Sequence, residues 1–214
     1  KEMQQAMLRN EPHEHCKYCV HKENIGGYKA RNGYNKYAKD FVKGDITKLK
    51  SPIVLDYRGS NFCNYKCRMC DHANSSLIAE EMYENPEEYK GLSNLNLTDF
   101  PVEQFLYNKD DKFSKFIDTI NLDNLEIIKL LGGEPMIQKE VFYILDKIKN
   151  PWDVALQFTT NGSNAAFVKR LDKFKKLSIR VSLDGIGKMH EYVRTGGIWD
   201  RTYKNMEIFA NTPK

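Results

Sequence analysis

The chain has 214 residues, of which 41% are hydrophobic and 29% are charged, and this composition suits one large soluble domain or a domain with an appendage. No stretch approaches the roughly 20 consecutive apolar residues of a membrane-spanning helix, so we expect no membrane partner. The 33 basic and 29 acidic residues give a formal charge of +4, which is too balanced to indicate a nucleic-acid partner.

All five cysteines fall in two clusters, Cys16 with Cys19 and Cys63 with Cys67 and Cys70. Thiols separated by two or three residues are typical of metal ligands in a reducing compartment, whereas a disulfide framework spreads an even number of cysteines through a short secreted chain. We therefore predict that these cysteines bind metal and that the protein is cytoplasmic.

The first 50 residues form a polar N-terminal extension, and residues 51–214 hold the regular part of the chain. Three histidines lie near Cys16 and Cys19, namely His13, His15 and His21. Such a set is able to form a small zinc site. Residues 28–39 interleave aromatic and basic side chains, and because the overall charge is nearly balanced we interpret them as a solvated basic loop rather than a nucleic-acid surface.

Short runs rich in apolar and β-branched residues predict four strands, at residues 53–57, 126–131, 154–158 and 178–183. Helical spacing predicts helices at residues 75–83, 112–120, 139–149, 165–174 and 203–210. Strands and helices alternate in the later part of the chain, which indicates an α/β fold with right-handed βαβ units and a parallel sheet.

A polar or glycine-rich turn follows each predicted strand. The turns contain the cysteines at 63–70, Gly-Gly-Glu-Pro at 132–135, Thr-Thr-Asn-Gly at 159–162 and Asp-Gly at 184–185. Because ligands bind at the carboxyl ends of the strands in parallel α/β folds, we expect these four turns to share one functional face.

The stretch CNYKCRMC places Cys63, Cys67 and Cys70 close together. Deprotonated thiols hold zinc or an iron-sulfur cluster, and His72 offers a fourth ligand for a Cys3His zinc site. Three thiolates on a cubane cluster instead leave one iron without a protein ligand, and an open metal position is what catalysis needs.

The turn from Gly132 to Pro135 also allows two interpretations. It suits a strand-to-helix turn in which the glycines take positive φ and Pro135 occupies the first helical position. It also suits a ligand site, because glycine lets the backbone approach a ligand and Glu134 supplies a negative charge for a bound ammonium.

The two motifs together, in this order and context, resemble the radical S-adenosylmethionine (radical SAM) superfamily. In that family three cysteines hold a 4Fe-4S cluster, and its open iron binds the amino and carboxylate groups of the methionine part of SAM. The resemblance implies that Cys63, Cys67 and Cys70 are the catalytic cluster ligands. Many members have an aromatic residue before the last cysteine, where this chain has Met69, and an apolar side chain still shields the cluster.

The resemblance also assigns cofactor contacts. Gly132, Gly133, Glu134 and Pro135 would form the turn that meets the methionine amino group of SAM.

Ser182 and Arg194 look like the pair that meets the ribose and the carboxylate of SAM, and the planar fork of arginine suits a carboxylate. A surface ion pair is the other interpretation of Arg194. Asn161 is a turn residue by default and a candidate for ribose or adenine contact. We expect His72 and His190 at polar surface or supporting positions.

The family fold implies a partial (β/α)6 barrel that stops after the fourth strand. The chain begins at Lys1 without an initiator Met and stops at Lys214 just after a predicted helix, so we expect a fragment. The sequence around Cys16 and Cys19 resembles the end of a SPASM or twitch domain. These two cysteines would then be half of an auxiliary iron-sulfur cluster site.

The predicted function is a radical SAM oxidoreductase or maturase that cleaves SAM reductively to a 5'-deoxyadenosyl radical, which abstracts hydrogen from its substrate. The implied partners are SAM, an electron donor such as flavodoxin or ferredoxin, and an unidentified peptide, protein or small molecule. The alternative is a non-catalytic, zinc-stabilised module that binds RNA or a protein. It predicts metal bound by four protein ligands and no affinity for SAM.

Overall fold

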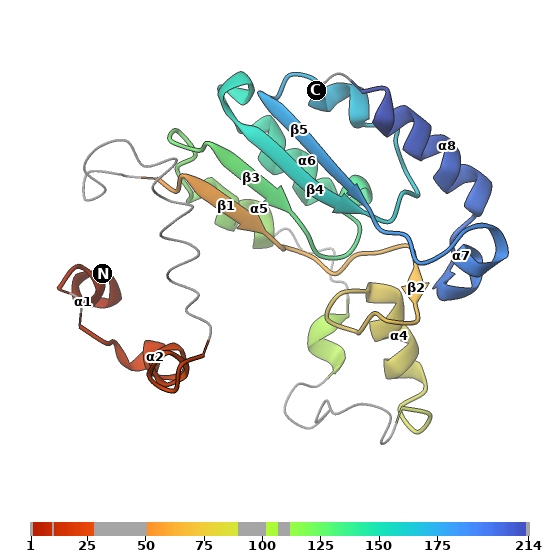
Figure 1. The fold of residues 1–214 in the computed structure, drawn as a ribbon. Coiled ribbons are helices and arrows are strands. Elements are labelled where there is room, and N and C mark those ends of the chain that lie inside the picture. Colours follow the sequence, from red (N-terminus) through yellow and green to blue (C-terminus); the bar gives the residue numbers. More distant parts are fainter. Residues whose placement is uncertain (1, 10, 28–50, 90–101, 107–111, 213–214) are drawn as a thin grey trace. The chain divides into compact units, whose positions relative to one another are not determined.

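The computed structural model describes residues 2–9, 11–27, 51–89, 102–106 and 112–212 (Figure 1). The chain divides into two compact units, Lys1–Lys48 and Leu49–Lys214. The assignment of the first 50 residues to an auxiliary domain stays a prediction. The basic segment at residues 28–39 lies outside the described residues.

The first unit contains α1 (Glu2–Leu8), the 3-10 helix η1 (Glu14–Cys16) and α2 (Lys17–Asn24). Cys16 is half-buried at the junction of η1 and α2, and Cys19 is exposed one turn later. The two thiols therefore lie on the first turn of a short helix.

The second unit is built on a sheet of four parallel strands. These are β1 (Val54–Tyr57), β3 (Ile127–Leu130), β4 (Ala155–Thr160) and β5 (Lys176–Val181), in the spatial order β1-β3-β4-β5. In register, Val54 pairs with Ile127, Ile127 with Ala155, and Ala155 with Lys176. The predicted α/β class and the parallel sheet of four strands are confirmed.

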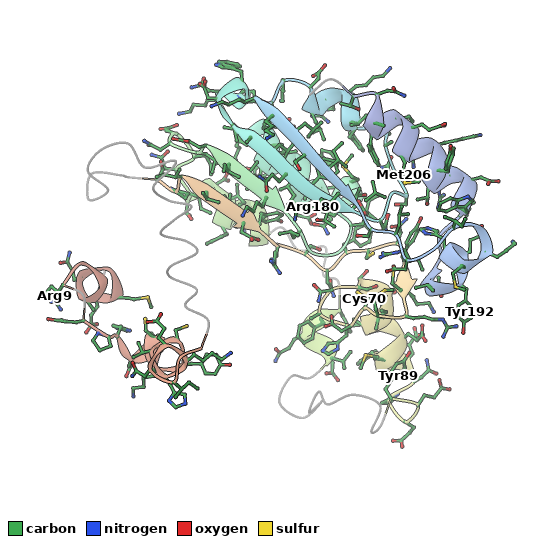
Figure 2. All side chains as sticks on the ribbon, in the orientation of Figure 1. Arg9, Cys70, Tyr89, Arg180, Tyr192 and Met206 are labelled. Carbon is green, nitrogen blue, oxygen red and sulfur yellow. The ribbon has the colours of Figure 1, made fainter. Side chains whose placement is uncertain are left out.

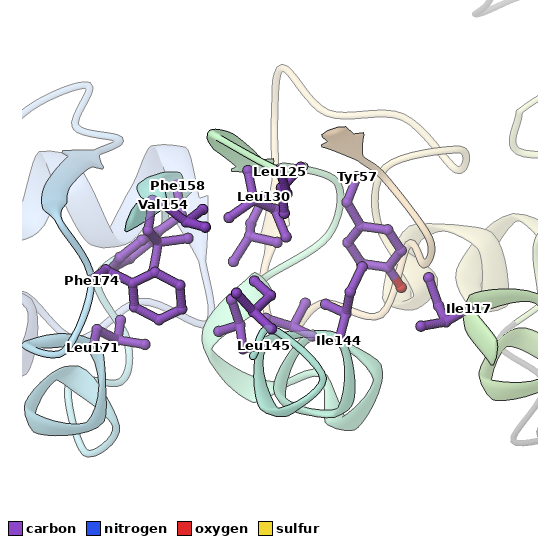
Figure 3. Close-up of a cluster of buried hydrophobic side chains, with 14 of the residues drawn as sticks. Tyr57, Ile117, Leu125, Leu130, Ile144, Leu145, Val154, Phe158, Leu171 and Phe174 are labelled. Carbon is purple, nitrogen blue, oxygen red and sulfur yellow. The ribbon is translucent and has the colours of Figure 1, made fainter. Parts of the chain in front are cut away.

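One face of this sheet is apolar and packs against helices. Its strand residues in the core are Leu55, Tyr57, Ile128, Leu130, Leu156, Phe158, Leu177 and Ile179. They contact the buried side of α6 (Lys139–Asp146), where Val141, Ile144 and Leu145 recur at helical spacing (Figure 3). We call this side the apolar face; α5 (Lys112–Asp118) and α6 lie over it (Figure 1).

The opposite side of the sheet is polar over the carboxyl half of the strands. We call it the polar face, and its members there are Asp56, Lys129, Gln157, Thr159, Ser178 and Arg180. Alternate strand residues point to opposite sides of a sheet, so the two faces arise from a single alternating pattern along each strand.

Other helices of the second unit include α4 (Ser76–Glu84), α7 (Gly187–Val193) and α8 (Trp199–Ala210). Short 3-10 helices occur at η3 (Val102–Phe105), η4 (Pro135–Ile137), η5 (Pro151–Asp153) and η6 (Val168–Leu171). The helices predicted at 75–83, 112–120, 139–149 and 203–210 are confirmed with shifted ends, whereas α7 was not predicted. Among the described residues no helix is long and apolar enough to span a membrane.

The helix predicted over residues 165–174 does not form, and this stretch holds only the 3-10 helix η6. A backbone hydrogen bond runs from the amide of Val168 to the carbonyl of Ala165, three residues back (3.1 Å). Just before it, the side chain of Asn164 accepts a hydrogen bond from the amide of Ala166 (2.9 Å). Such a local turn competes with the start of an α-helix.

Candidate functional site

The three clustered cysteines lie on the loop that follows β1. Cys63 and Cys67 are buried, Cys70 is half-buried, and all three belong to one cluster with the fully buried ring of Tyr65. The hydroxyl of Ser75 donates a hydrogen bond to the carbonyl of Tyr65 (2.8 Å). The loop is thus fixed to the start of α4, with its thiols in one cluster. Cys70 is labelled in Figure 2.

Burial raises the pKa of all three thiols. The pKa of Cys63 reaches about 11, where burial is the main cause and the nearby carboxyl of Glu134 adds to it. Burial likewise raises the pKa of Cys67, which the guanidinium of Arg194 partly opposes, and the pKa of Cys70. The thiols are therefore protonated at neutral pH without metal, and metal binding must displace those protons.

The loop after β3 has the geometry of a tight strand-to-helix turn. Gly132 and Gly133 take φ values of +81° and +52°, and Pro135 occupies the first position of η4. A Cβ atom on Gly133 would lie 2.3 Å from the carbonyl oxygen of Phe62. Glycine is therefore required here by the close approach of the loop that precedes Cys63.

Glu134 is fully buried and joins this turn to the end of β4. Its carboxylate accepts hydrogen bonds from the amide of Met136 (3.0 Å), the hydroxyl of Thr160 (2.7 Å) and the amide of Asn161 (2.6 Å). Burial raises the pKa of Glu134, and these hydrogen bonds oppose the shift. Both carboxylate oxygens have protein partners, and contact with a ligand ammonium stays a prediction.

Asn161 connects the turn after β4 to the cysteine loop. Its side-chain amide donates to Oδ1 of Asn64 (2.9 Å) and lies 3.9 Å from the sulfur of Cys63. Its side-chain oxygen accepts a hydrogen bond from the amide of Ser163 (2.9 Å). Asn161 is therefore a turn residue, as the default interpretation holds, and it also contacts a predicted cluster ligand.

Arg194 lies beside Cys67, although they are far apart in the sequence. The two residues pair in a small antiparallel ribbon between β2 (Lys66–Cys67) and β6 (Arg194–Thr195), and Nη1 of Arg194 is 3.6 Å from the sulfur of Cys67. The guanidinium also pairs with Asp184, while its buried Nε has no hydrogen-bond partner. The ion pair expected for Arg194 is present, but it lies at the cysteine loop and is largely buried.

Ser182 comes directly after the last strand of the parallel sheet rather than within it, because β5 ends at Val181. Its amide donates to the carbonyl of Thr160 (2.9 Å), so it is fixed next to the turn that contains Asn161. The structure thus brings Ser182 to the same edge of the sheet as the other predicted cofactor contacts.

Gln138 is a site residue that the sequence prediction missed. It is fully buried, and its side-chain nitrogen donates to the carbonyls of Ser60 (3.3 Å), Phe62 (3.1 Å) and Gly132 (3.0 Å). These bonds hold the glycine turn against the loop that leads into the cysteines. In the sequence, only the position of Gln138 three residues after Pro135 could have indicated a role in the site, and this is weak information.

Both histidines expected at polar surface or supporting positions are buried, which corrects the surface placement. His72 is 4% exposed and packs edge-on against the ring of Phe105. His190 is fully buried, packs against Trp199 and has its Nε2 3.5 Å from the hydroxyl of Thr202. Burial lowers the pKa of His190, so it is neutral at physiological pH.

Within the described ranges, no three His, Cys, Asp or Glu side chains are close enough to hold one metal ion. A 4Fe-4S cluster takes each thiolate on a different iron atom. The three thiols of this loop belong to one cluster with Tyr65 and have the chemistry that such a group needs, while the Cys3His zinc set with His72 stays an alternative.

Comparisons with known proteins agree with this fit. The model of the radical SAM superfamily matches residues 57–212. The S-adenosylmethionine-dependent nucleotide dehydratase of Fibrobacter sp. (strain UWH6) is 24% identical over 116 residues, which are 54% of this chain and 29% of that protein.

Two solved structures also resemble the chain. Native anSMEcpe with bound AdoMet has a TM-score of 0.42 and 16% identity over 74% of this chain and 40% of that one. The same protein with AdoMet and the Cp18Cys peptide has a TM-score of 0.43 and 16% identity over 75% and 40% of the two chains. The chain thus spans less than half the length of these relatives.

The family model covers more than half of the chain, and the parallel sheet matches part of the radical SAM barrel. Membership in this family implies a 4Fe-4S cluster and SAM as cofactors. The protein belongs to the radical SAM superfamily.

Proposed function

We propose that the protein is a radical SAM enzyme in which Cys63, Cys67 and Cys70 hold the 4Fe-4S cluster. When bound, the cluster supplies the electron that cleaves SAM to methionine and a 5'-deoxyadenosyl radical, which abstracts hydrogen from the substrate. The observation that carries the proposal is the gathering of three thiols around Tyr65, beside Asn161 and Arg194.

The chain's own residues would place SAM in three ways. The turn that contains Gly132 and Gly133 brings backbone close to the cysteine loop, where a methionine amino group would bind. Arg194 has a buried Nε without a partner, which supports binding of the SAM carboxylate by its planar fork. Ser182 and Asn161 stand at the ends of neighbouring strands and would contact the ribose or adenine.

The protein would also restrict water near the cluster. Tyr65 is fully buried against Cys63 and Cys67, so these thiols are screened from one side. Met69 is 57% exposed, and its shielding of a bound cluster stays a prediction. A bound cofactor would have to cover the other side.

The exposed position of Met69 between Cys67 and Cys70 supports electron entry at this loop. We propose flavodoxin or ferredoxin as the donor, and hence a cytoplasmic protein. Reduction of the cluster by flavodoxin is expected to be slower in a Met69→Glu variant, because an acidic side chain repels an acidic carrier. Equal rates in the variant and the parent would contradict this docking place.

The class of enzyme is proposed as an oxidoreductase or maturase. Its substrate would be a peptide, a protein or a small molecule, and the dehydratase relative adds nucleotides to the small molecules worth testing.

Cys16 and Cys19 would supply two ligands of an auxiliary cluster of the SPASM or twitch type. Replacing both by serine is then expected to lower the iron content while the response of the first cluster to SAM remains.

The test is formation of 5'-deoxyadenosine, measured by chromatography and mass spectrometry after anaerobic reconstitution with iron and sulfide and reduction by dithionite. We expect product with the parent and with Cys19→Ala, and none with Cys67→Ala. Circular dichroism checks that each variant is folded. Stoichiometric zinc with no product in any sample would favour the zinc-stabilised binding module instead.

A further inference from the structure

The polar face of the sheet contains donor groups that the proposed cofactor site does not use. Lys129, Gln157, Ser178 and Arg180 come from three neighbouring strands and line a hollow of about 30 Å³. A cavity needs only about 10–15 Å³ of this kind of volume to hold a water molecule, so the hollow has room for a small polar group of a ligand.

The strand residues of this face carry an excess of positive charge. Three of them are cationic, Lys129, Lys176 and Arg180, and Asp56 is the one carboxylate that these four described strands place there. Asp56 is already paired with Arg58, whose Nε lies 3.1 Å from the carboxylate oxygen. The face thus attracts anions.

Arg180 is the most informative of these residues (labelled in Figure 2). Its side chain is exposed, and among the described residues it makes no hydrogen bond, ion pair or ring contact. Arg194, by contrast, pairs with Asp184. A free guanidinium offers five N–H donors in a planar fork that matches the oxygens of phosphate and carboxylate.

The hollow lies below the edge at which SAM is proposed to bind. Arg180 precedes Ser182 by two residues, and Lys129 precedes Gly132 by three. At about 3.3 Å per strand residue, the cations lie roughly 7–10 Å from that edge along the strands. A substrate held there by its charged group would extend its neutral part toward the cofactor.

We propose that Arg180, with Lys129, Gln157 and Ser178, binds an anionic group of the substrate, a phosphate or a carboxylate. The inference rests on the proposed function, because the polar face is a substrate site only if SAM binds at the adjoining edge. The planar guanidinium of Arg180 would orient the anionic group through paired N–H donors. The side chains of Lys129, Gln157 and Ser178 would donate further hydrogen bonds to the same group. The substrate class is thereby narrowed to anionic molecules.

The test is isothermal titration of the reconstituted protein with SAM bound, at constant ionic strength. Inorganic phosphate and succinate are the two probes, and they distinguish a phosphorylated from a carboxylated substrate. We expect one of them to bind saturably at one site, and Arg180→Gln to weaken it about tenfold. Arg180→Lys keeps the positive charge but lacks the planar guanidinium. Its affinity for the probe should lie between those of the parent and Arg180→Gln.

Arg201→Gln is the matched control, because Arg201 is also an exposed arginine but lies on α8. This variant should bind the probe like the parent. The proposal is overturned if neither probe binds saturably, if Arg180→Gln binds like the parent, or if both arginine variants lose the same affinity. The spectrum of the reduced cluster with and without SAM, taken on the same samples, shows separately whether the proposed function itself fails.

Discussion

The two faces of the parallel sheet differ although they are made by the same four strands. On the apolar face, neighbouring strands contribute Ile128, Leu156 and Leu177, which pack into the main core. One residue further along two of these strands, the polar face presents Lys129 and Gln157. A parallel sheet covered on both faces has nearly continuous apolar strands, and this alternation is consistent with the proposed binding of a ligand on the polar face.

The contrast separates the residues that stabilise the fold from those that bind ligands. Stability depends on the apolar face, whereas the proposed chemistry depends on the polar face and on the turns at its carboxyl edge. Between them, Glu134 and Gln138 are buried polar residues that fix the turns to the sheet. Substitutions should therefore have different effects according to which of these three groups they change.

The largest effect on stability is expected on the apolar face. Leu156→Ala removes a fully buried side chain from the core and should lower the free energy of unfolding by about 2–5 kcal/mol. Gln157 is the next residue along the strand and lies on the polar face. Gln157→Ala should change the free energy of unfolding by about 0.5 kcal/mol or less. Urea unfolding measures both, and equal losses would remove the distinction between the faces.

The next largest effect concerns pH and the metal-free cysteine loop. The pKa of Cys63 is about 11 in the folded protein and 9.0 when unperturbed. Between these values the unfolded thiol loses its proton first, so metal-free stability should fall by up to about 1.4 kcal/mol per pH unit as pH rises. Unfolding at several pH values should show a weaker slope for Cys63→Ala, and equal slopes would contradict the burial effect.

A loss smaller than that of Leu156→Ala is expected at the residues that hold the turns. Gln138→Ala leaves the carbonyls of Ser60, Phe62 and Gly132 without this donor. We expect a loss of about 1–3 kcal/mol in the free energy of unfolding. The variant should also bind SAM more weakly, because the glycine turn loosens. Gln157→Ala serves again as the control, and a loss at Gln138 no larger than at Gln157 would show that the turn is held by other contacts.

Much of the sheet was predictable because its signal is local. The runs at 126–131 and 154–158 combine β-branched and apolar residues, and β3 and β4 form within or near them. The glycines at 132 and 133 and the proline at 135 also carry local information, because positive φ and a fixed proline φ each favour a particular turn. These features depend little on distant parts of the chain.

The parts that were missed depend on contacts between distant residues. The ribbon of β2 and β6 joins Cys67 to Arg194 across a long stretch of chain, and each strand has only two residues, too few to show a period. The role of Gln138 depends on three carbonyls of other loops. His190 is buried because α7 and α8 pack together, and its sequence neighbours do not indicate this.

The most direct test of the central claim is the electron paramagnetic resonance spectrum of the reconstituted, dithionite-reduced protein with and without SAM. The account predicts a reduced 4Fe-4S signal that changes when SAM is added, and its loss in Cys70→Ala but not in Cys19→Ala. A reduced signal that SAM leaves unchanged, or no cluster signal with zinc bound in its place, would contradict the assignment of an open-site cluster to Cys63, Cys67 and Cys70.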